Sequence, residues 1–241
     1  MEISNGKGET IDWIIFDLDD TLYPERDYVL SGFRSVSKYL EKAGYLDSVS
    51  TFDFLSKRFE EGVRGKTFDL LIEHFGLRGI EPVELVSLYR THYPKINLYP
   101  GMKEIIEGLR ESFRLGIITD GYSLSQTLKI ESLEIRNIFD RIMLTDLFGR
   151  EHWKPDSFVF ELFKEDERID VNGAIYIGDN PLKDFKPARD VGFKTVRIVY
   201  EDGIYRDAKP PIGFEPDTTI YSVSELKELV EDISVLTDEV H

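Results

Sequence analysis

The chain has 241 residues, of which 41% are hydrophobic and 32% are charged. This composition is typical of a folded globular protein with one large domain, or with a large domain and a smaller insert. The formal net charge of −16 argues against a general binder of nucleic acid or anionic membrane, because such proteins neutralise phosphates with Lys and Arg. The lack of cysteine excludes disulfides, thiolate metal sites and a cysteine nucleophile.

The start of the chain also bears on location. Residues 1–13 contain no apolar core of a signal peptide, and no run approaches the roughly 18 apolar residues of a membrane span. We therefore expect a cytoplasmic protein that acts away from membranes.

The first predicted strand is WIIFDL, residues 13–18, and a helical stretch follows it. Between residues 25 and 98, apolar residues recur at helical spacing in four segments, and no segment has a strand pattern. Pro100 and Gly101 mark the point where the pattern changes again. We expect a helical cap domain at 25–98 and an α/β core domain formed by 1–24 and 99–241.

Strands and helices alternate through the rest of the chain. Short, β-branched runs predict strands at 114–120, 141–146, 173–179 and 194–199, with helices at 102–112, 124–133, 157–164 and 182–190. A Pro/Gly-rich loop, a short strand near 218–222 and a helix from Ser224 close the chain. Continuous apolar strands are buried on both faces, so we predict an α/β fold with a doubly wound, mainly parallel sheet.

Acidic residues follow the first strand in an unusual density. Asp17 and Asp19 are two residues apart in an extended segment, so their side chains start toward the same side. When two carboxylates lie close together, each suppresses the ionisation of the other unless a cation or a basic group lies between them. A simpler interpretation is that Asp19, Asp20 and Thr21 are turn or helix-capping residues.

Three other segments carry polar residues at predicted strand ends or loops. Thr119 ends the second core strand, and Asp120 and Gly121 form a turn whose backbone amides can face an anion. Lys154 precedes Pro155, which restricts its backbone. Each feature has an ordinary structural explanation as well, either turn formation or a solvated surface lysine.

The segment YIGDNPLKD completes the set. Asp179 and Asn180 follow a predicted strand, Pro181 fits the first position of a helix, and Asp184 lies near its first turn. The alternative is an Asx cap without a chemical role. Because ligands of open parallel sheets bind beyond the carboxyl ends of the strands, we expect these acidic groups to converge.

The order of these four motifs resembles the haloacid dehalogenase (HAD) superfamily. The resemblance rests on DLDDT at 17–21, Thr119, Lys154-Pro155 and GDNPLKD at 178–184, and it spans roughly residues 12–222. The helical insert after the first motif resembles the class 1 cap of HAD phosphatases. Each motif alone is weak, whereas the four in this order are highly specific.

The resemblance implies roles for the acidic residues. Asp17 would be the nucleophile that forms an aspartyl-phosphate, and Asp19 would protonate the leaving oxygen and then deprotonate water. Mg²⁺ would be held by Asp17, Asp179 and the backbone carbonyl of Asp19. Asp184 would order a metal-bound water or Lys154 rather than bind the metal directly.

The remaining motifs would bind the phosphate. Thr119, Lys154 and the turn at Asp120 and Gly121 would hold the oxygens that are not transferred, and Lys154 would also relieve the carboxylate cluster. A dehalogenase has no leaving alkoxide to protonate, so the second aspartate favours phosphoryl chemistry. The resemblance therefore implies a phosphatase acting on a small phosphorylated acid, a sugar phosphate or a nucleotide.

Specificity is expected in the cap. Arg64 and Lys66 lie between two helical patterns, where capped relatives carry a specificity loop, although a solvated turn explains them equally well. Two alternatives to the phosphatase remain: a sugar-phosphate mutase of the same superfamily, and a non-catalytic metal-binding regulatory module. Neither a Gly-x-Gly-x-x-Gly nor a Walker-type motif is present, which argues against a nucleotide-binding oxidoreductase.

Overall fold

A computed structural model describes the backbone of residues 11–238 and the side chains of residues 11–233. Its centre is a sheet of six parallel strands in the order β3-β2-β1-β4-β5-β6. The strands are β1 (Trp13–Phe16), β2 (Arg114–Thr119), β3 (Arg141–Leu144), β4 (Ala174–Gly178), β5 (Lys194–Ile198) and β6 (Thr218–Ile220). The predicted doubly wound α/β fold is therefore confirmed.

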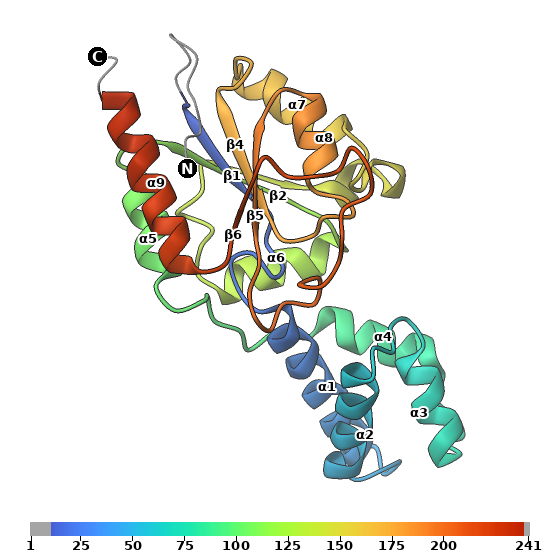
Figure 1. The fold of residues 1–241 in the computed structure, drawn as a ribbon. Coiled ribbons are helices and arrows are strands. Elements are labelled where there is room, and N and C mark those ends of the chain that lie inside the picture. Colours follow the sequence, from blue (N-terminus) through green and yellow to red (C-terminus); the bar gives the residue numbers. More distant parts are fainter. Residues whose placement is uncertain (1–10, 239–241) are drawn as a thin grey trace.

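Helices cover both faces of the sheet (Figure 1). One face packs on α5 (Met102–Leu109), α6 (Ser123–Ser132) and α9 (Val223–Asp238), and the other on α7 (Phe158–Glu167) and α8 (Phe185–Asp190). Along β1, Ile14 and Phe16 join the first cluster, whereas Trp13 and Ile15 join the second. This alternation follows from the period of two residues in a strand and explains why the whole strand is apolar.

Four of the five helices between β1 and β2 form a group of their own in Figure 1: α1 (Glu25–Lys42), α2 (Ser48–Glu60), α3 (Thr67–Phe75) and α4 (Pro82–Thr91). They share a separate apolar cluster around Phe33, whose ring meets those of Phe59 and Phe68 edge-on. The four helical segments expected between 25 and 98 are thus present. The exact limits of a cap domain at 25–98 stay a prediction.

The helix expected at 182–190 begins later than predicted. Pro181 is in a turn rather than at the first helical position, and α8 starts only at Phe185. Asn180 accepts a hydrogen bond from the backbone N–H of Leu182 at 3.0 Å, and Asp184 accepts one from the N–H of Asn180 at 2.9 Å. These side-chain bonds compete with helical ones and hold residues 180–184 as a loop.

Two short 3₁₀ helices, Thr145–Phe148 and Arg150–His152, follow β3. Across the described part of the chain, every helix is too short or too polar to cross a membrane. The expectation that the start of the chain carries no signal sequence concerns mainly residues 1–10, which lie outside the described residues.

Candidate active site

The carboxyl ends of three adjacent strands bring the predicted motifs together. Asp17 directly follows β1, Thr119 is the last residue of β2, and Asp179 directly follows β4. The N–H of Asp17 bonds to the carbonyl of Ile177 at 2.8 Å, so the ladder between β1 and β4 extends to the aspartate itself. The position of Asp17 is therefore fixed by the sheet.

Three carboxylates meet at this edge. Asp17, Asp179 and Asp184 each offer an oxygen, and these atoms lie within 4.8 Å of one another. Lys154 Nζ lies 2.7 Å from Asp17 Oδ1, 2.7 Å from Asp184 Oδ1 and 2.9 Å from the hydroxyl of Tyr176. All four charged side chains are buried, so residues from Asp17 to Asp184, far apart in sequence, form one cluster.

Burial controls the electrostatics of this cluster. It raises the pKa of Asp17 to about 6, although the nearby Lys154 acts in the opposite direction. Burial, reinforced by Asp184 and Asp17, holds the pKa of Asp179 well above its usual range. One lysine thus does not balance the carboxylates, and an all-oxygen set with excess negative charge fits a hard divalent cation such as Mg²⁺.

Asp19 has a different environment. Lys129 Nζ contacts both carboxylate oxygens at 2.7 and 2.9 Å, Gln126 Nε2 donates at 3.0 Å, and the Tyr23 hydroxyl also donates. Burial alone would raise the pKa of Asp19, but Lys129 and these hydrogen bonds outweigh it and lower the pKa below its ordinary value. Asp19 is therefore held as an anion beside the Asp17 cluster.

Lys129 and Gln126 were not predicted from the sequence as site residues. They lie on α6, where positions 126, 129, 130 and 133 form one helical stripe that is otherwise apolar. Two polar residues on the inner face of an amphipathic helix were the signal that could have identified them. Only their burial against Asp19 shows which chemistry they serve.

Thr119 and Asp120, predicted to belong to a phosphate-binding motif after β2, already form hydrogen bonds within the protein. The Thr119 hydroxyl is fully buried and accepts a bond from Gln126 Nε2 at 2.6 Å. Asp120 accepts bonds from Lys183 Nζ at 3.0 Å and from the N–H of Lys154 at 3.1 Å, which tie its turn to the lysine motif. Gly121 has a φ of +121°, a value that favours glycine.

A pocket of about 410 Å³ opens over these groups. From the predicted set, it is lined by Asp17, Asp19, Asp120, Gly121, Lys154 and Asp179. The chain adds further residues to its walls, among them Glu25, Arg90, Tyr122, Lys129, Lys183 and Tyr205. The pocket thus lies where the α1–α4 helices approach the end of the sheet.

The two cap residues expected to contact substrate lie elsewhere. Arg64 donates to the carbonyls of Phe59 and Val63 at 2.8 and 3.0 Å and stacks over the Phe59 ring, lining a neighbouring pocket of about 240 Å³. Lys66 is exposed at the start of α3 and lines neither pocket. A role of Arg64 and Lys66 in substrate binding remains a prediction.

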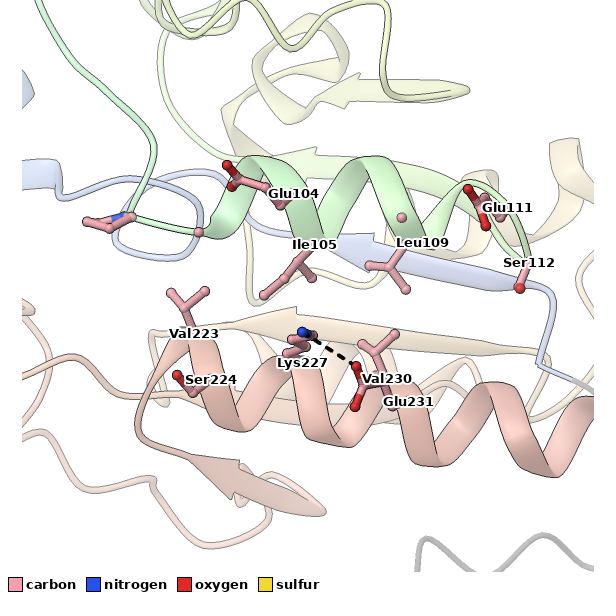
Figure 2. Close-up of a pocket in the computed structure, with 13 residues that line it drawn as sticks. Glu104, Ile105, Leu109, Glu111, Ser112, Val223, Ser224, Lys227, Val230 and Glu231 are labelled. Carbon is pink, nitrogen blue, oxygen red and sulfur yellow. Dashed lines mark ion pairs between the residues drawn. The ribbon is translucent and has the colours of Figure 1, made fainter.

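A larger pocket of about 690 Å³ lies away from the carboxylates, between α5 and α9 (Figure 2). Its floor is apolar, with Ile105 and Leu109 facing Val223 and Val230, and Lys227 pairs with Glu231 at 3.7 Å along α9. Among the described residues, the three-carboxylate cluster lies at the smaller pocket and not here, so we take the smaller pocket as the candidate active site.

Comparisons with known proteins agree with this geometry. The model of the haloacid dehalogenase-like hydrolase family matches residues 14–198. A glyceraldehyde 3-phosphate phosphatase of Methanocaldococcus jannaschii is 30% identical over 230 residues, which cover 92% of this chain and 97% of the relative. A ribulose-1,5-bisphosphate 5-phosphatase of Halopiger xanaduensis is 25% identical over 239 residues, covering 90% and 98%.

Solved structures show the same fold. A HAD-hydrolase of Bacillus subtilis, YfnB, bound to magnesium, superposes with a TM-score of 0.69 at 21% identity and covers 92% of this chain and 99% of its own. The family model matches most of the chain, and the alignment with the phosphatase of Methanocaldococcus jannaschii covers almost the whole of both proteins. This chain therefore belongs to the haloacid dehalogenase-like hydrolase family.

Proposed function

We propose that this enzyme is a Mg²⁺-dependent phosphatase that hydrolyses a small phosphomonoester through phosphoryl transfer to Asp17. The observation that carries the proposal is the buried cluster in which Asp17, Asp179 and Asp184 meet around Lys154. Asp17 and Asp179 would hold the metal together with the Asp19 carbonyl, and Asp184 would orient Lys154. The cation, when bound, neutralises the phosphate and the carboxylates so that an anionic nucleophile can approach phosphorus.

In the first step, an oxygen of Asp17 attacks phosphorus while the bond from phosphorus to the leaving oxygen breaks. Asp19, an anion in the free enzyme, would take up a proton when the negatively charged substrate binds beside it, because like charge favours the neutral carboxyl, and it would give this proton to the leaving oxygen as the alcohol departs. In the second step, Asp19 takes a proton from water, and the water oxygen attacks the aspartyl-phosphate to release phosphate and free Asp17. Lys129, Gln126 and Tyr23 hold the Asp19 carboxylate in place and favour the anionic form that accepts this proton.

Lys154 and Thr119 would hold the phosphate oxygens that are not transferred. Lys154 keeps its proton because the neighbouring carboxylates raise its pKa well above the ordinary value despite burial. The Thr119 hydroxyl is fully buried at the strand end and does not line the pocket as it stands, so it would have to give up its contact with Gln126 and become accessible to bind phosphate. These groups supply positive charge locally in a chain whose net charge is −16.

The substrate class follows from the pocket and the relatives. A pocket of about 410 Å³ accommodates a phosphate with a short carbon chain or a single sugar. The relatives named above act on glyceraldehyde 3-phosphate and ribulose 1,5-bisphosphate, and both compounds are small phosphorylated sugars. These names favour net hydrolysis over the mutase and over a non-catalytic module.

The test is hydrolysis of p-nitrophenyl phosphate with Mg²⁺, followed by release of p-nitrophenol. We expect activity that EDTA abolishes and that Asp17→Asn lowers at least about 1,000-fold, because that amide cannot attack phosphorus. Undiminished activity of Asp17→Asn would refute the assignment of the nucleophile. Conversion of a sugar phosphate to its isomer without release of phosphate would instead identify a mutase.

A further inference from the structure

The pocket contains a basic group that the hydrolytic mechanism does not use. Three of its lysines contact carboxylates: Lys154 with Asp17 and Asp184, Lys183 with Asp120, and Lys129 with Asp19. Arg90, at the end of α4, also lines the pocket. Among the described residues, no carboxylate lies within 4.0 Å of its guanidinium.

Arg90 is nevertheless held in place. Its guanidinium lies 3.6 Å from the ring centroid of Tyr122, and its backbone carbonyl accepts a bond from the Ser125 hydroxyl at 2.9 Å. Tyr122 and Ser125 belong to the start of α6, so the arginine of the cap rests on the core beside the catalytic groups. An arginine fixed by stacking keeps its planar set of N–H donors free for a ligand.

The surroundings of Arg90 are short of acceptors. Arg150 also stacks over Tyr122, at 4.7 Å, and donates to its hydroxyl. The indole of Trp153, which meets the Tyr122 ring edge-on, has a buried N–H without a hydrogen-bond partner. Arg90 and Arg150 thus both stack on Tyr122, and among the described residues neither forms an ion pair with a carboxylate, although the chain has 46 acidic and 30 basic side chains.

Glu25 is the acidic side chain of the pocket that stands outside the lysine pairs and the metal cluster. Burial, reinforced by Asp19, raises its pKa to about 8, so the carboxyl is mostly neutral at pH 7. It therefore opposes the binding of an anion near Arg90 only weakly.

We propose that Arg90, seated on Tyr122, binds a second anionic group on the alcohol part of the substrate, either a carboxylate or another phosphate. The natural substrate would then be a short phosphomonoester with a further acid group, such as a phosphorylated hydroxy acid or a bisphosphate. The inference rests on the proposed phosphatase function and adds specificity to it. Bidentate bonds from a guanidinium match both kinds of acid group.

The test compares pairs of substrates that differ only in the second group. 3-Phosphoglycerate is paired with glycerol 3-phosphate, and propane-1,3-diol bisphosphate with its monophosphate, with phosphate release measured in Mg²⁺. We expect the wild-type enzyme to favour the member of at least one pair that carries the second acid group, by about 10- to 100-fold in kcat/KM. The pair that shows the preference distinguishes a carboxylate from a phosphate.

Arg90→Ala should abolish that preference, mainly through a higher KM for the substrate with the second acid group, so that kcat/KM falls more for this substrate than for its partner. Arg90→Lys should keep part of the preference because it retains charge but loses the planar fork. Arg58→Ala is the matched control: Arg58 also stacks on an aromatic ring of the cap, that of Phe54, but pairs with Glu61 away from the pocket.

The outcomes separate the two proposals. If the wild-type enzyme hydrolyses p-nitrophenyl phosphate but does not distinguish either pair, or if Arg90→Ala lowers both members of a pair equally, the anion site is wrong. If no phosphomonoester is hydrolysed at all, the underlying function fails instead. Thermal melts check that Arg90→Ala folds. If Arg90→Ala is unstable, the substrate preference of Arg90→Lys tests the anion site in its place.

Discussion

Glu25 and Asp19 are half-buried carboxyl groups of the same pocket whose pKa values move in opposite directions. Lys129 touches Asp19 at 2.7 Å and outweighs the effect of burial, so the pKa of Asp19 falls. No such contact compensates Glu25, and burial raises its pKa to about 8. Lys129, together with the hydrogen bonds from Gln126 and Tyr23, therefore decides the charge of Asp19, whereas Asp17 keeps a raised pKa of about 6 despite its contact with Lys154.

The raised pKa of Glu25 predicts a pH dependence of stability. Below the unfolded value of 4.5, Glu25 is protonated in both states and contributes nothing. Between 4.5 and about 8, the unfolded chain loses the proton while the folded protein keeps it, so stability falls as pH rises. We expect Glu25→Gln to melt at a higher temperature than the wild type, by a margin that grows over this range and then levels off.

Melting curves of both proteins at several pH values in EDTA provide the measurement. A melting-temperature difference that stays constant from pH 5 to pH 9 would contradict the prediction. Glu41→Gln, a change at an exposed glutamate of α1, serves as control and should show no such trend.

At the scale of elements, the turn after β1 joins three parts of the molecule. Asp20 has a φ of +50°, and its carboxylate accepts bonds from the N–H of Glu25 at 2.7 Å and of Ile204 at 2.7 Å. Glu25 begins α1, and Ile204 lies in the loop after β5 and packs against the cap cluster. For Asp20, the simpler interpretation of the motif as turn and helix-start chemistry is therefore correct.

We expect Asp20→Ala to lower the free energy of unfolding by about 2–4 kcal/mol, because two buried N–H groups lose their acceptor and alanine disfavours positive φ. Asp20→Asn should cost less, since it keeps one acceptor oxygen and tolerates this backbone. Urea unfolding at pH 8 measures both. Asp47→Ala, which removes a single exposed cap bond to Ser50, should cost about 1 kcal/mol; a loss for Asp20→Ala no larger than this would refute the bridging role.

At the scale of the whole molecule, the fold concentrates acidic groups that repel one another. The chain carries a charge of −16, and the sheet gathers Asp17, Asp179 and Asp184 with only Lys154 between them. Active-site preorganisation thus opposes stability until a cation binds. Any ligand that binds only the folded state shifts the unfolding equilibrium toward the folded state.

We expect Mg²⁺ at about 100 times its Kd to add about 2.7 kcal/mol of stability, which corresponds to a rise in Tm of roughly 5–10 °C. NaCl at the same ionic strength is the control, because screening of a charge of −16 also stabilises the fold. Asp179→Asn should melt no lower than wild type in EDTA and should lose the response to Mg²⁺. A Mg²⁺ response that survives in Asp179→Asn would remove this residue from the metal site.

The sequence by itself determined the sheet and the position of the catalytic motifs. Strands that are apolar throughout require burial on both faces, and a parallel sheet places all their carboxyl ends, with Asp17, Thr119 and Asp179, at one edge. The helical period likewise predicted α1 to α4. These are local patterns with periods of 2 and 3.6 residues, and they can be recognised without knowing which distant residues they contact.

Only the tertiary structure decided which side chains complete the site. Lys129 and Arg90 come from helices whose periodicity says which face is buried, but not which partner they meet. Arg64 donates to the carbonyls of Phe59 in α2 and of Val63 in the following turn, contacts that its sequence pattern did not indicate, and its role in substrate binding stays a prediction. Contacts between distant segments depend on how helices pack, and packing is set by the shapes of both surfaces rather than by either sequence pattern alone.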